Sequence, residues 1–128
     1  MRVFPCRDSP VRTRVILMSH HLVGGLEPPY YTVVFTSVQT QELEGYGEVA
    51  VRMGQLVKDV PGFLGLDSAR TPGGVGITVA YFRDEEAIAA WRRNLEHQEA
   101  QRRGREQWYQ RYSVHVGRVE RSYGFERG

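Results

Sequence analysis

Apolar side chains follow two different periods along the chain, and these periods predict strands and helices in turn. Residues 30–38, which follow a stretch rich in Gly and Pro, are dense in β-branched and aromatic side chains, a composition typical of a strand. Between residues 46 and 60 apolar positions recur at steps of three and four, which predicts an amphipathic helix. Pro61-Gly62 ends that helix.

The second half of the chain repeats this alternation of elements. Strands are predicted at residues 63–70 and 75–82, because the turn-forming sequence Thr-Pro-Gly-Gly lies between two apolar runs. Asp84 can cap a second helix that runs toward Gly104 on an apolar stripe of Ile88, Trp91 and Leu95. A last strand is predicted from the alternating residues Tyr112, Val114 and Val116. The order β-α-β-β-α-β is that of the ferredoxin-like motif, an α+β fold with two main helices on one face of a four-stranded antiparallel sheet.

The predicted strands carry apolar side chains on both of their sides. In residues 30–38 and 77–82, both sets of alternate positions hold bulky apolar or aromatic residues. A sheet covered by helices on one face only would instead alternate between apolar and polar residues. The second face therefore needs a cover of its own. A second copy of the chain is the expected cover, which predicts a homodimer, and the alternative is that the N-terminal tail folds over that face.

Length and composition indicate one globular domain. The 128 residues are 41% hydrophobic and 25% charged, ordinary values for a protein with a packed core. We expect residues 1–28 to form a loose tail and residues 29–128 to form the domain. The apolar patch at residues 15–18 is too short for a secretory signal, and no run approaches the ~20 residues of a membrane span. Cys6 is the single cysteine, so a reducing, cytoplasmic location without membrane association is expected.

The charged residues argue against nucleic-acid binding. Five arginines gather between residues 92 and 105, but glutamates lie among them at helical neighbour spacing. Local ion pairs on a solvated helix face are therefore expected in place of a basic stripe. His20 and His21 are adjacent in the predicted tail and lack further spaced ligands, so no metal site is expected.

Several motifs in these elements resemble the antibiotic biosynthesis monooxygenase family. They are Pro61-Gly-Phe-Leu-Gly65, Gly76-Ile-Thr-Val-Ala-Tyr-Phe82, Trp91, Glu96-His97, Ala100-Gln101, Gly104-Arg-Glu-Gln-Trp-Tyr109, Tyr112 and Val116-Gly-Arg-Val-Glu-Arg-Ser-Tyr123. The resemblance implies a dimeric α+β barrel of two ferredoxin-like chains whose sheets face each other. For some members it implies oxygen insertion into polycyclic aromatic substrates without metal or organic cofactor, in a pocket between sheet and helices. Other members degrade haem.

The haem-degrading branch of the family uses an Asn in the first strand, a Trp in the second helix and a His at a set distance after that Trp. Trp91 matches, but Gln101 stands where the His is expected, and residues 30–38 contain no Asn. His97 follows Trp91 by six residues, which on a continuous helix places it roughly 120° round the axis from the Trp. Haem degradation is therefore disfavoured, and no cofactor is expected.

His97 is the candidate catalytic base, because imidazole changes protonation near neutral pH. It shares a helix stripe with Asn94 and Gln101, which could form the polar wall of a substrate pocket. In this interpretation His97 removes a proton from a phenol or an activated carbon acid, and the resulting anion reacts with oxygen. The alternative is a His that only hydrogen-bonds a neighbouring loop. Arg70 is the candidate cation that stabilises the anion, against the alternative of a surface ion pair.

Aromatic residues supply the candidate walls of a substrate-binding pocket. Trp91 lies on the apolar stripe of the second helix, where ligand contact and plain core packing are both open. Tyr31, Phe35 and Tyr81 lie in strands, where a pocket floor and a dimer interface are equally natural. Trp108, in the turn after the second helix, is a candidate ligand contact or part of a structural corner.

Two hypotheses from different classes follow. The first is an antibiotic-biosynthesis-type monooxygenase that acts on an aromatic or polycyclic small molecule, with His97 as base and Arg70 as anion stabiliser. The second is a dimer that binds a small hydrophobic ligand, or serves as an interaction module, without catalysis. A cavity reached by His97 favours the first hypothesis, and solid packing around Trp91 favours the second.

Overall fold

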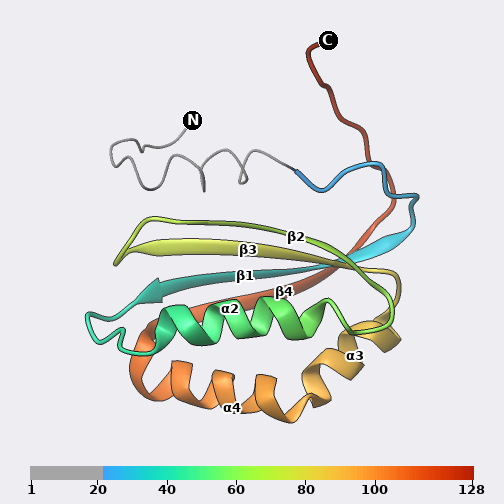
Figure 1. The fold of residues 1–128 in the computed structure, drawn as a ribbon. Coiled ribbons are helices and arrows are strands. Elements are labelled where there is room, and N and C mark those ends of the chain that lie inside the picture. Colours follow the sequence, from blue (N-terminus) through green and yellow to red (C-terminus); the bar gives the residue numbers. More distant parts are fainter. Residues whose placement is uncertain (1–21) are drawn as a thin grey trace.

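The computed structural model describes residues 22–128, which form one antiparallel sheet with helices on one side (Figure 1). The sheet has four strands in the order β2-β3-β1-β4. In chain order the elements are β1 (Tyr30–Gln39), α2 (Tyr46–Val57), β2 (Phe63–Arg70), β3 (Val75–Phe82), α3 (Glu85–Arg93), α4 (Leu95–Arg103), the π-helical turn η1 (Gly104–Trp108) and β4 (Tyr109–Val119). This arrangement confirms the predicted ferredoxin-like α+β fold.

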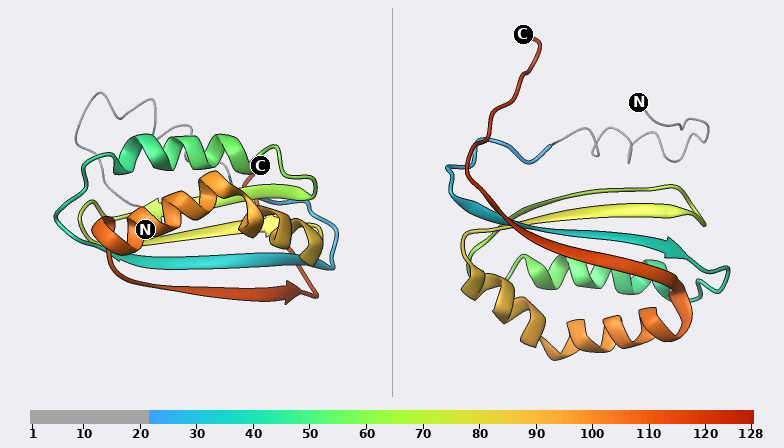
Figure 2. Two further views of the ribbon diagram at one scale, coloured as in Figure 1. Left: turned by 90° about the horizontal axis from the view of Figure 1, so that it is seen from below. Right: turned by 180° about the vertical axis from the view of Figure 1, so that it is seen from behind.

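Strand β1 lies at the centre of the sheet, where it pairs with β3 on one edge and with β4 on the other. Val33 lies opposite Ala80 of β3, and both side chains pack toward the helices. The next pair, Val34 and Val79, points the other way because side chains alternate along a strand. Figure 2 shows α2, α3 and α4 together on one side of the sheet. We call that side the helix face and the opposite side the open face.

The buried core lies where the end of α2 and the start of α3 meet the helix face. Phe82 of β3 is fully buried, and Val57, Ala87 and Ile88 are buried around it. Phe63 meets the Phe82 ring edge-on, at 5.7 Å between ring centres. Burial of a large apolar side chain stabilises a fold by ~1.5–3 kcal/mol. These contacts therefore fix one end of the helix layer to the sheet.

An aromatic corner closes the opposite end of the helix layer. Trp108, the last residue of η1, is buried, and its indole N–H donates a hydrogen bond to the Glu44 carbonyl at 3.0 Å. Tyr46, the first residue of α2, meets the Trp108 ring edge-on at 5.5 Å between ring centres. The Arg103 guanidinium lies over the same ring, 4.6 Å from its centre. The corner thus connects the end of α4 to the start of α2.

The second helical segment differs from the single helix predicted between Asp84 and Gly104. Asp84 caps α3 as expected, because its carboxylate accepts a hydrogen bond from the Ala87 N–H at 2.9 Å. The chain then leaves the helical conformation at Asn94, where ψ is 123°, and starts again as α4. Leu95, which a continuous stripe would bury, is 80% exposed. The helix layer therefore bends at Asn94.

The open face of the sheet is apolar along its two central strands. Val34 and Val79 lie there, and Val75 and Ile77 of β3 are 52% and 47% exposed. Described residues near the N-terminus approach this face at β2: the Val23 N–H donates to the Asp67 carboxylate at 3.1 Å. The predicted loose tail falls mostly on residues 1–21, outside the described part of the chain. The two covers predicted for the open face, a second copy of the chain and the N-terminal tail, thus stay predictions.

The C-terminal residues 120–128 run away from the sheet on the side opposite the helices (Figure 1). Tyr123 and Phe125 in this segment are 95% and 83% exposed. Across residues 22–128, each helix is too short or too polar to span a lipid bilayer.

We expect Gly62→Ala to destabilise the fold, because Gly62 has φ of 94° and an added Cβ would lie 2.8 Å from the Ala87 Cβ. The left-handed conformation costs a non-glycine residue ~1–2 kcal/mol, and a clash in the core costs a further ~1–3 kcal/mol. Urea denaturation should show a free energy of unfolding lower by ~2–5 kcal/mol. Gly73 is the matched control, since its φ is 72° and open space surrounds it. Equal losses in Gly62→Ala and Gly73→Ala would contradict the packing described for Ala87.

Candidate functional site

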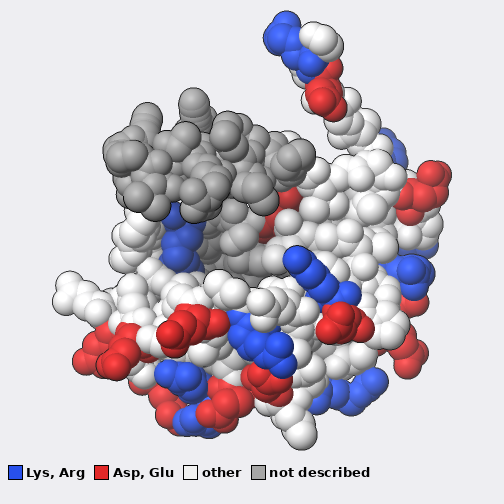
Figure 3. Space-filling model, viewed as in Figure 1, with Lys and Arg blue, Asp and Glu red and all other residues white. Residues whose placement is uncertain are grey.

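The helices leave part of the helix face accessible to solvent. Val33 and Ala80 lie on the two central strands and face the helices, yet both are only partly buried. On the outer strands, Leu66 is 39% exposed and Val116 is 55% exposed. Figure 3 shows the surface hollowed between β2 and α2. An accessible, largely apolar space between the sheet and the helices is therefore where the candidate residues must be sought.

Trp91 and His97 are brought together at the bend of the helix layer. Their rings are stacked, with 4.0 Å between centres and 13° between planes. The His97 Nδ1 atom lies 3.0 Å from the Trp91 carbonyl oxygen. A continuous helix would separate the two side chains by roughly 120° round its axis. The break at Asn94 turns the first residues of α4 so that His97 reaches back to Trp91, which also packs against the buried core.

The hydrogen bond of His97 determines which ring nitrogen carries the proton. A carbonyl oxygen can only accept, so Nδ1 donates to Trp91 and holds the hydrogen. In the neutral imidazole, Nε2 is then unprotonated and can accept a proton. Burial lowers the pKa of His97 below its usual value, and the hydrogen bond to Trp91 opposes this only in part. The ring is therefore neutral at physiological pH, as a general base must be.

Asn94 and Gln101, the predicted polar neighbours of His97, have different positions. The Asn94 side-chain oxygen accepts a hydrogen bond from the His97 backbone N–H at 2.9 Å and so caps α4. Gln101 lies one turn after His97 on α4 and is partly buried. Gln101 thus keeps the expected position on the same helix side as His97, whereas the oxygen of Asn94 is used by the backbone.

Arg70 ends β2 with its side chain on the helix face. Its guanidinium donates to the Gly74 carbonyl at 2.7 Å, to the Ser37 hydroxyl and, at 3.5 Å, to the Ser37 carbonyl. Ser37 is buried, and a Cβ at Gly76 would collide with the guanidinium. Arg70 is therefore held over the hairpin by polar groups of β1 and the β2–β3 turn, in a different environment from the surface ion pair weighed above.

A cluster of tyrosines lies next to Arg70, and two of its members, Tyr46 and Tyr112, were not predicted as part of the site. Phe35 lies 5.5 Å from Tyr109 and 5.1 Å from Tyr112 between ring centres, and Tyr46 lies 6.0 Å from Tyr109. The Tyr109 hydroxyl donates to that of Tyr46 at 3.5 Å. Burial raises the pKa of Tyr109 strongly, the contact with Tyr46 raises it further, and Arg70 opposes the change. Phe35 thus lines the helix face with the rings of Tyr109 and Tyr112 packed around it.

Tyr81 and Tyr31, both predicted as substrate contacts, point to opposite sides of the sheet. Tyr31 packs against the buried core on the helix face. Tyr81 lies on the open face, where its hydroxyl donates to the Asp67 carboxylate at 3.1 Å. Burial and then the bond to Asp67 raise the pKa of Tyr81. The structure therefore does not bring Tyr81 together with His97. Trp108 is buried in the aromatic corner, so it has the structural role that was weighed as the alternative to ligand contact.

Two cavities lie away from the Trp91–His97 pair. One, of about 690 Å³, is bordered by the start of α2 and the end of α4, with lining residues Glu44, Gly45, Gly47, Glu48, Arg103 and Gln107. The other, of about 290 Å³, is lined by Thr36, Val38, Val75, Arg111, Tyr112 and Ser113. Neither has His97 or Trp91 in its lining. Within residues 22–128, no three His, Cys, Asp or Glu side chains gather as a metal site would require.

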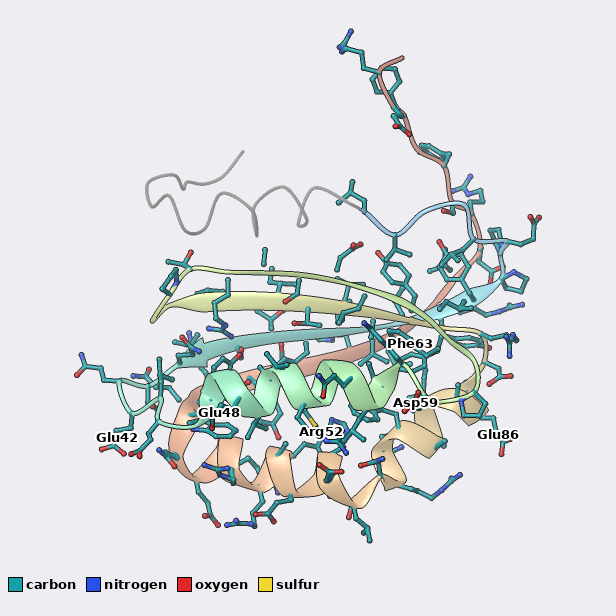
Figure 4. The ribbon with its side chains drawn as sticks, viewed as in Figure 1. Glu42, Glu48, Arg52, Asp59, Phe63 and Glu86 are labelled. Atoms are coloured by element: carbon teal, nitrogen blue, oxygen red, sulfur yellow. The ribbon has the colours of Figure 1, made fainter. Side chains whose placement is uncertain are left out.

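An ion pair connects α2 and α4 beside His97. Arg52 extends from α2 below the sheet (Figure 4). It binds the Glu96 carboxylate of α4 through two hydrogen bonds, of 2.9 and 3.0 Å. The pair is exposed to solvent, and it lowers the pKa of Glu96 and raises that of Arg52. Glu96 precedes His97, so the pair attaches the first turn of α4 to α2.

Solved structures of low sequence identity share this fold. SnoaB from Streptomyces nogalater, a cofactor-independent oxygenase, gives a TM-score of 0.64 at 12% identity over 74% of this chain and 97% of SnoaB. Rv0793 from Mycobacterium tuberculosis gives 0.65 at 12% identity, over 74% of this chain and 99% of Rv0793. PA3566 from Pseudomonas aeruginosa gives 0.59 at 17% identity, over 77% of this chain and the whole of PA3566. These likenesses concern the fold.

Sequence comparison reaches further than the fold. The chain is 49% identical over 100 residues to YqjZ, an uncharacterised protein of Bacillus subtilis. The matched region covers 78% of this chain and 88% of YqjZ. Residues 29–103 match the family model described as antibiotic biosynthesis monooxygenase. That range includes the central strand, the Trp91–His97 pair and Arg70. The chain belongs to the antibiotic biosynthesis monooxygenase family.

Proposed function

We propose that the protein is a cofactor-independent monooxygenase that acts on an aromatic or polycyclic small molecule at the helix face. Family membership and a fold shared with SnoaB, a cofactor-independent oxygenase, support this reaction class. The observation that carries the proposal is the hydrogen bond from His97 Nδ1 to the Trp91 carbonyl, which leaves Nε2 as a proton acceptor. The substrate is accordingly one with an acidic proton, either a phenol or an activated carbon acid.

The proposed reaction begins with proton transfer. His97 Nε2 takes the proton from the substrate hydroxyl, and the phenolate that forms is a much better electron donor than the phenol. The phenolate reduces oxygen, the two combine at a ring carbon, and the peroxide loses water to leave a quinone. One oxygen atom remains in the product and the other leaves as water. All four electrons that reduce the oxygen molecule come from the substrate, which is oxidised from phenol to quinone and gives up its ring hydrogen and hydroxyl hydrogen to the water. The balance therefore requires no external reductant.

Arg70 and the aromatic residues complete the proposed site. Arg70 is a fixed cation on the helix face, and it would stabilise a developing anion at that end of the space. Phe35 and Trp91 offer ring faces or edges to a flat substrate. Gln101 supplies a polar group one turn from His97. Tyr81 has no role in this scheme, since it lies on the open face.

A second candidate function is ligand binding without catalysis. The cavity of about 690 Å³ between α2 and α4 favours it, because that cavity is lined neither by the candidate base nor by Trp91. In that case His97 and Trp91 act as packing residues under the bend of the helix layer. Turnover of any phenol with oxygen uptake separates the two functions.

We also propose that the open face packs against the same face of a second copy. Val34 and Val79 lie at its centre, and Val75 and Ile77 leave about half of their surface in water in the single chain. Burial of such apolar area on association is favourable by ~25 cal/mol per Å² before the entropic costs. Cys6, a lone thiol in the sequence, supports a reducing cytoplasmic location for the dimer.

His97→Gln should remove most of the oxygen uptake with a phenolic substrate, because loss of a general base costs typically ~10²–10⁴-fold in rate. His115→Gln is the matched control for loss of an imidazole, since His115 is exposed on the outer strand β4 and points to the open face, away from the helices. Sedimentation equilibrium checks that this variant still dimerises. Oxygen-electrode assays across a panel of mono- and polycyclic phenols measure both variants. Activity unchanged in His97→Gln would remove the role of base, and no uptake by the parent protein on any phenol would favour the binding function.

The pH dependence of kcat/KM belongs to the same test. The pKa of His97 is lowered, so the ring becomes protonated, and the rate falls, only below the usual histidine value of ~6.5. The folded state then binds fewer protons than the unfolded state, so stability also rises with pH across the window from the lowered pKa to ~6.5. Both dependences should be absent from His97→Gln. If kcat/KM instead began to fall with decreasing pH at a midpoint above ~6.5, the interpretation of His97 as a desolvated base would be contradicted.

Ile77→Lys should weaken the dimer, because a charge on the open face would be buried in the interface. We expect the dimer dissociation constant from sedimentation equilibrium to rise at least ~10-fold, the equivalent of ~1.4 kcal/mol. Val51→Lys is the control, as Val51 is 64% exposed on α2. A parent protein that is monomeric at micromolar concentration, or an equal effect of both variants, would contradict the open-face interface.

A further inference from the structure

Asn94 is at once the last cap of α3 and the first cap of α4. Its backbone N–H donates to the Trp91 carbonyl at 3.2 Å, which closes α3. Its side-chain oxygen accepts from the His97 N–H at 2.9 Å, and its carbonyl accepts from the Gln98 N–H at 2.9 Å, which together open α4. Between these bonds ψ of Asn94 is 123°, an extended value. One residue therefore ends one helix and begins the next without a linker.

The break frees the acceptor that His97 uses. In a continuous α-helix, the Trp91 carbonyl would accept the N–H of Leu95, four residues on. It would then have a helical partner, and His97 would lie ~9 Å further along the axis and on another side of the helix. With the break, the carbonyl accepts from Asn94 and from His97 Nδ1, and the two rings stack at 4.0 Å. The geometry of the pair thus depends on the conformation of Asn94.

We propose that Asn94 is a positioning residue that acts through His97: by capping α4 it holds the imidazole on Trp91 with Nδ1 engaged and Nε2 free. The catalytic consequence rests on the proposed function, but the structural role does not. Asn is among the preferred N-cap residues, and Ser is a neutral residue that caps comparably. Ala cannot cap and has the highest helix propensity, so it favours joining α3 and α4 into one helix.

Neighbouring residues allow the positioning role of Asn94 to be distinguished from a general stabilisation of the bend between α3 and α4. The Gln98 side chain donates to the Arg92 carbonyl at 3.1 Å and also spans the break, whereas the hydrogen bonds of His97 run to Asn94 and Trp91. The charged groups beside the break are Arg92 and Arg93 at the end of α3 and Glu96 at the start of α4, the last of which is paired with Arg52 of α2. Asn94→Ser leaves all these charges unchanged, whereas Asn94→Asp would add one.

The test compares Asn94→Ala, Asn94→Ser and Gln98→Ala by proton NMR of the His97 ring in the full chain. Stacking on the indole of Trp91 shifts the His97 ring protons upfield, and burial of the ring in that position lowers the pKa of His97 below its usual value. We expect Asn94→Ala to lose the upfield shift and to bring that pKa back toward the usual value. Asn94→Ser and Gln98→Ala should keep both signatures.

Turnover adds a second, separate readout. If the proposed monooxygenase activity is present, kcat of Asn94→Ala should fall by about 10²-fold, the effect of a misplaced catalytic group, with KM little changed and recovery in Asn94→Ser. Absence of turnover in the parent protein would refute the proposed function and leave the NMR test intact. A folded Asn94→Ala that keeps the stacked, low-pKa ring would overturn the positioning role. If Asn94→Ala does not fold, a folded Asn94→Ser that loses the stack would overturn it instead.

Discussion

The position of β1 at the centre of the sheet limits what every other element can do. Both edges of β1 are paired, so each of its side chains must point either to the helix face or to the open face. Phe35 points to the helices beside Arg70 of β2, whereas Tyr81 and Ile77 of β3 point away. A slip of one residue would exchange the two sets. The register thus separates the candidate chemistry from the candidate interface.

On the helix face, the candidate chemistry depends on an interrupted helix more than on any one side chain. An imidazole on a regular helix beyond Trp91 would face another direction and lack a carbonyl partner. The cap at Asn94 changes both conditions, and Arg52 fixes the turned segment to α2 through Glu96. The result is a desolvated ring in one tautomer. Local backbone geometry and proposed proton transfer are thereby connected.

Most of the fold could be predicted from periodicity, since residues 63–70 and 75–82 were expected as the strands that the structure contains. The break at Asn94 was missed because the apolar stripe continues through Leu95, although an Asn before a polar turn is a cap signal. His97 was identified as a candidate from its chemistry, but its contact with Trp91 could not be predicted, because that contact depends on the break at Asn94. Strand register is also absent from the sequence, so nothing there placed Tyr81 on the other face.

The protonation of the His97 ring tests the central claim most directly, because the proposed chemistry requires a neutral imidazole with its proton on one particular nitrogen. Nitrogen-15 NMR of the ring, in the unmodified protein at pH values above the lowered pKa, distinguishes the two tautomers. The structure predicts a hydrogen on Nδ1 and a bare Nε2. A hydrogen on Nε2, or the mixture of tautomers found for a free imidazole, would contradict the account.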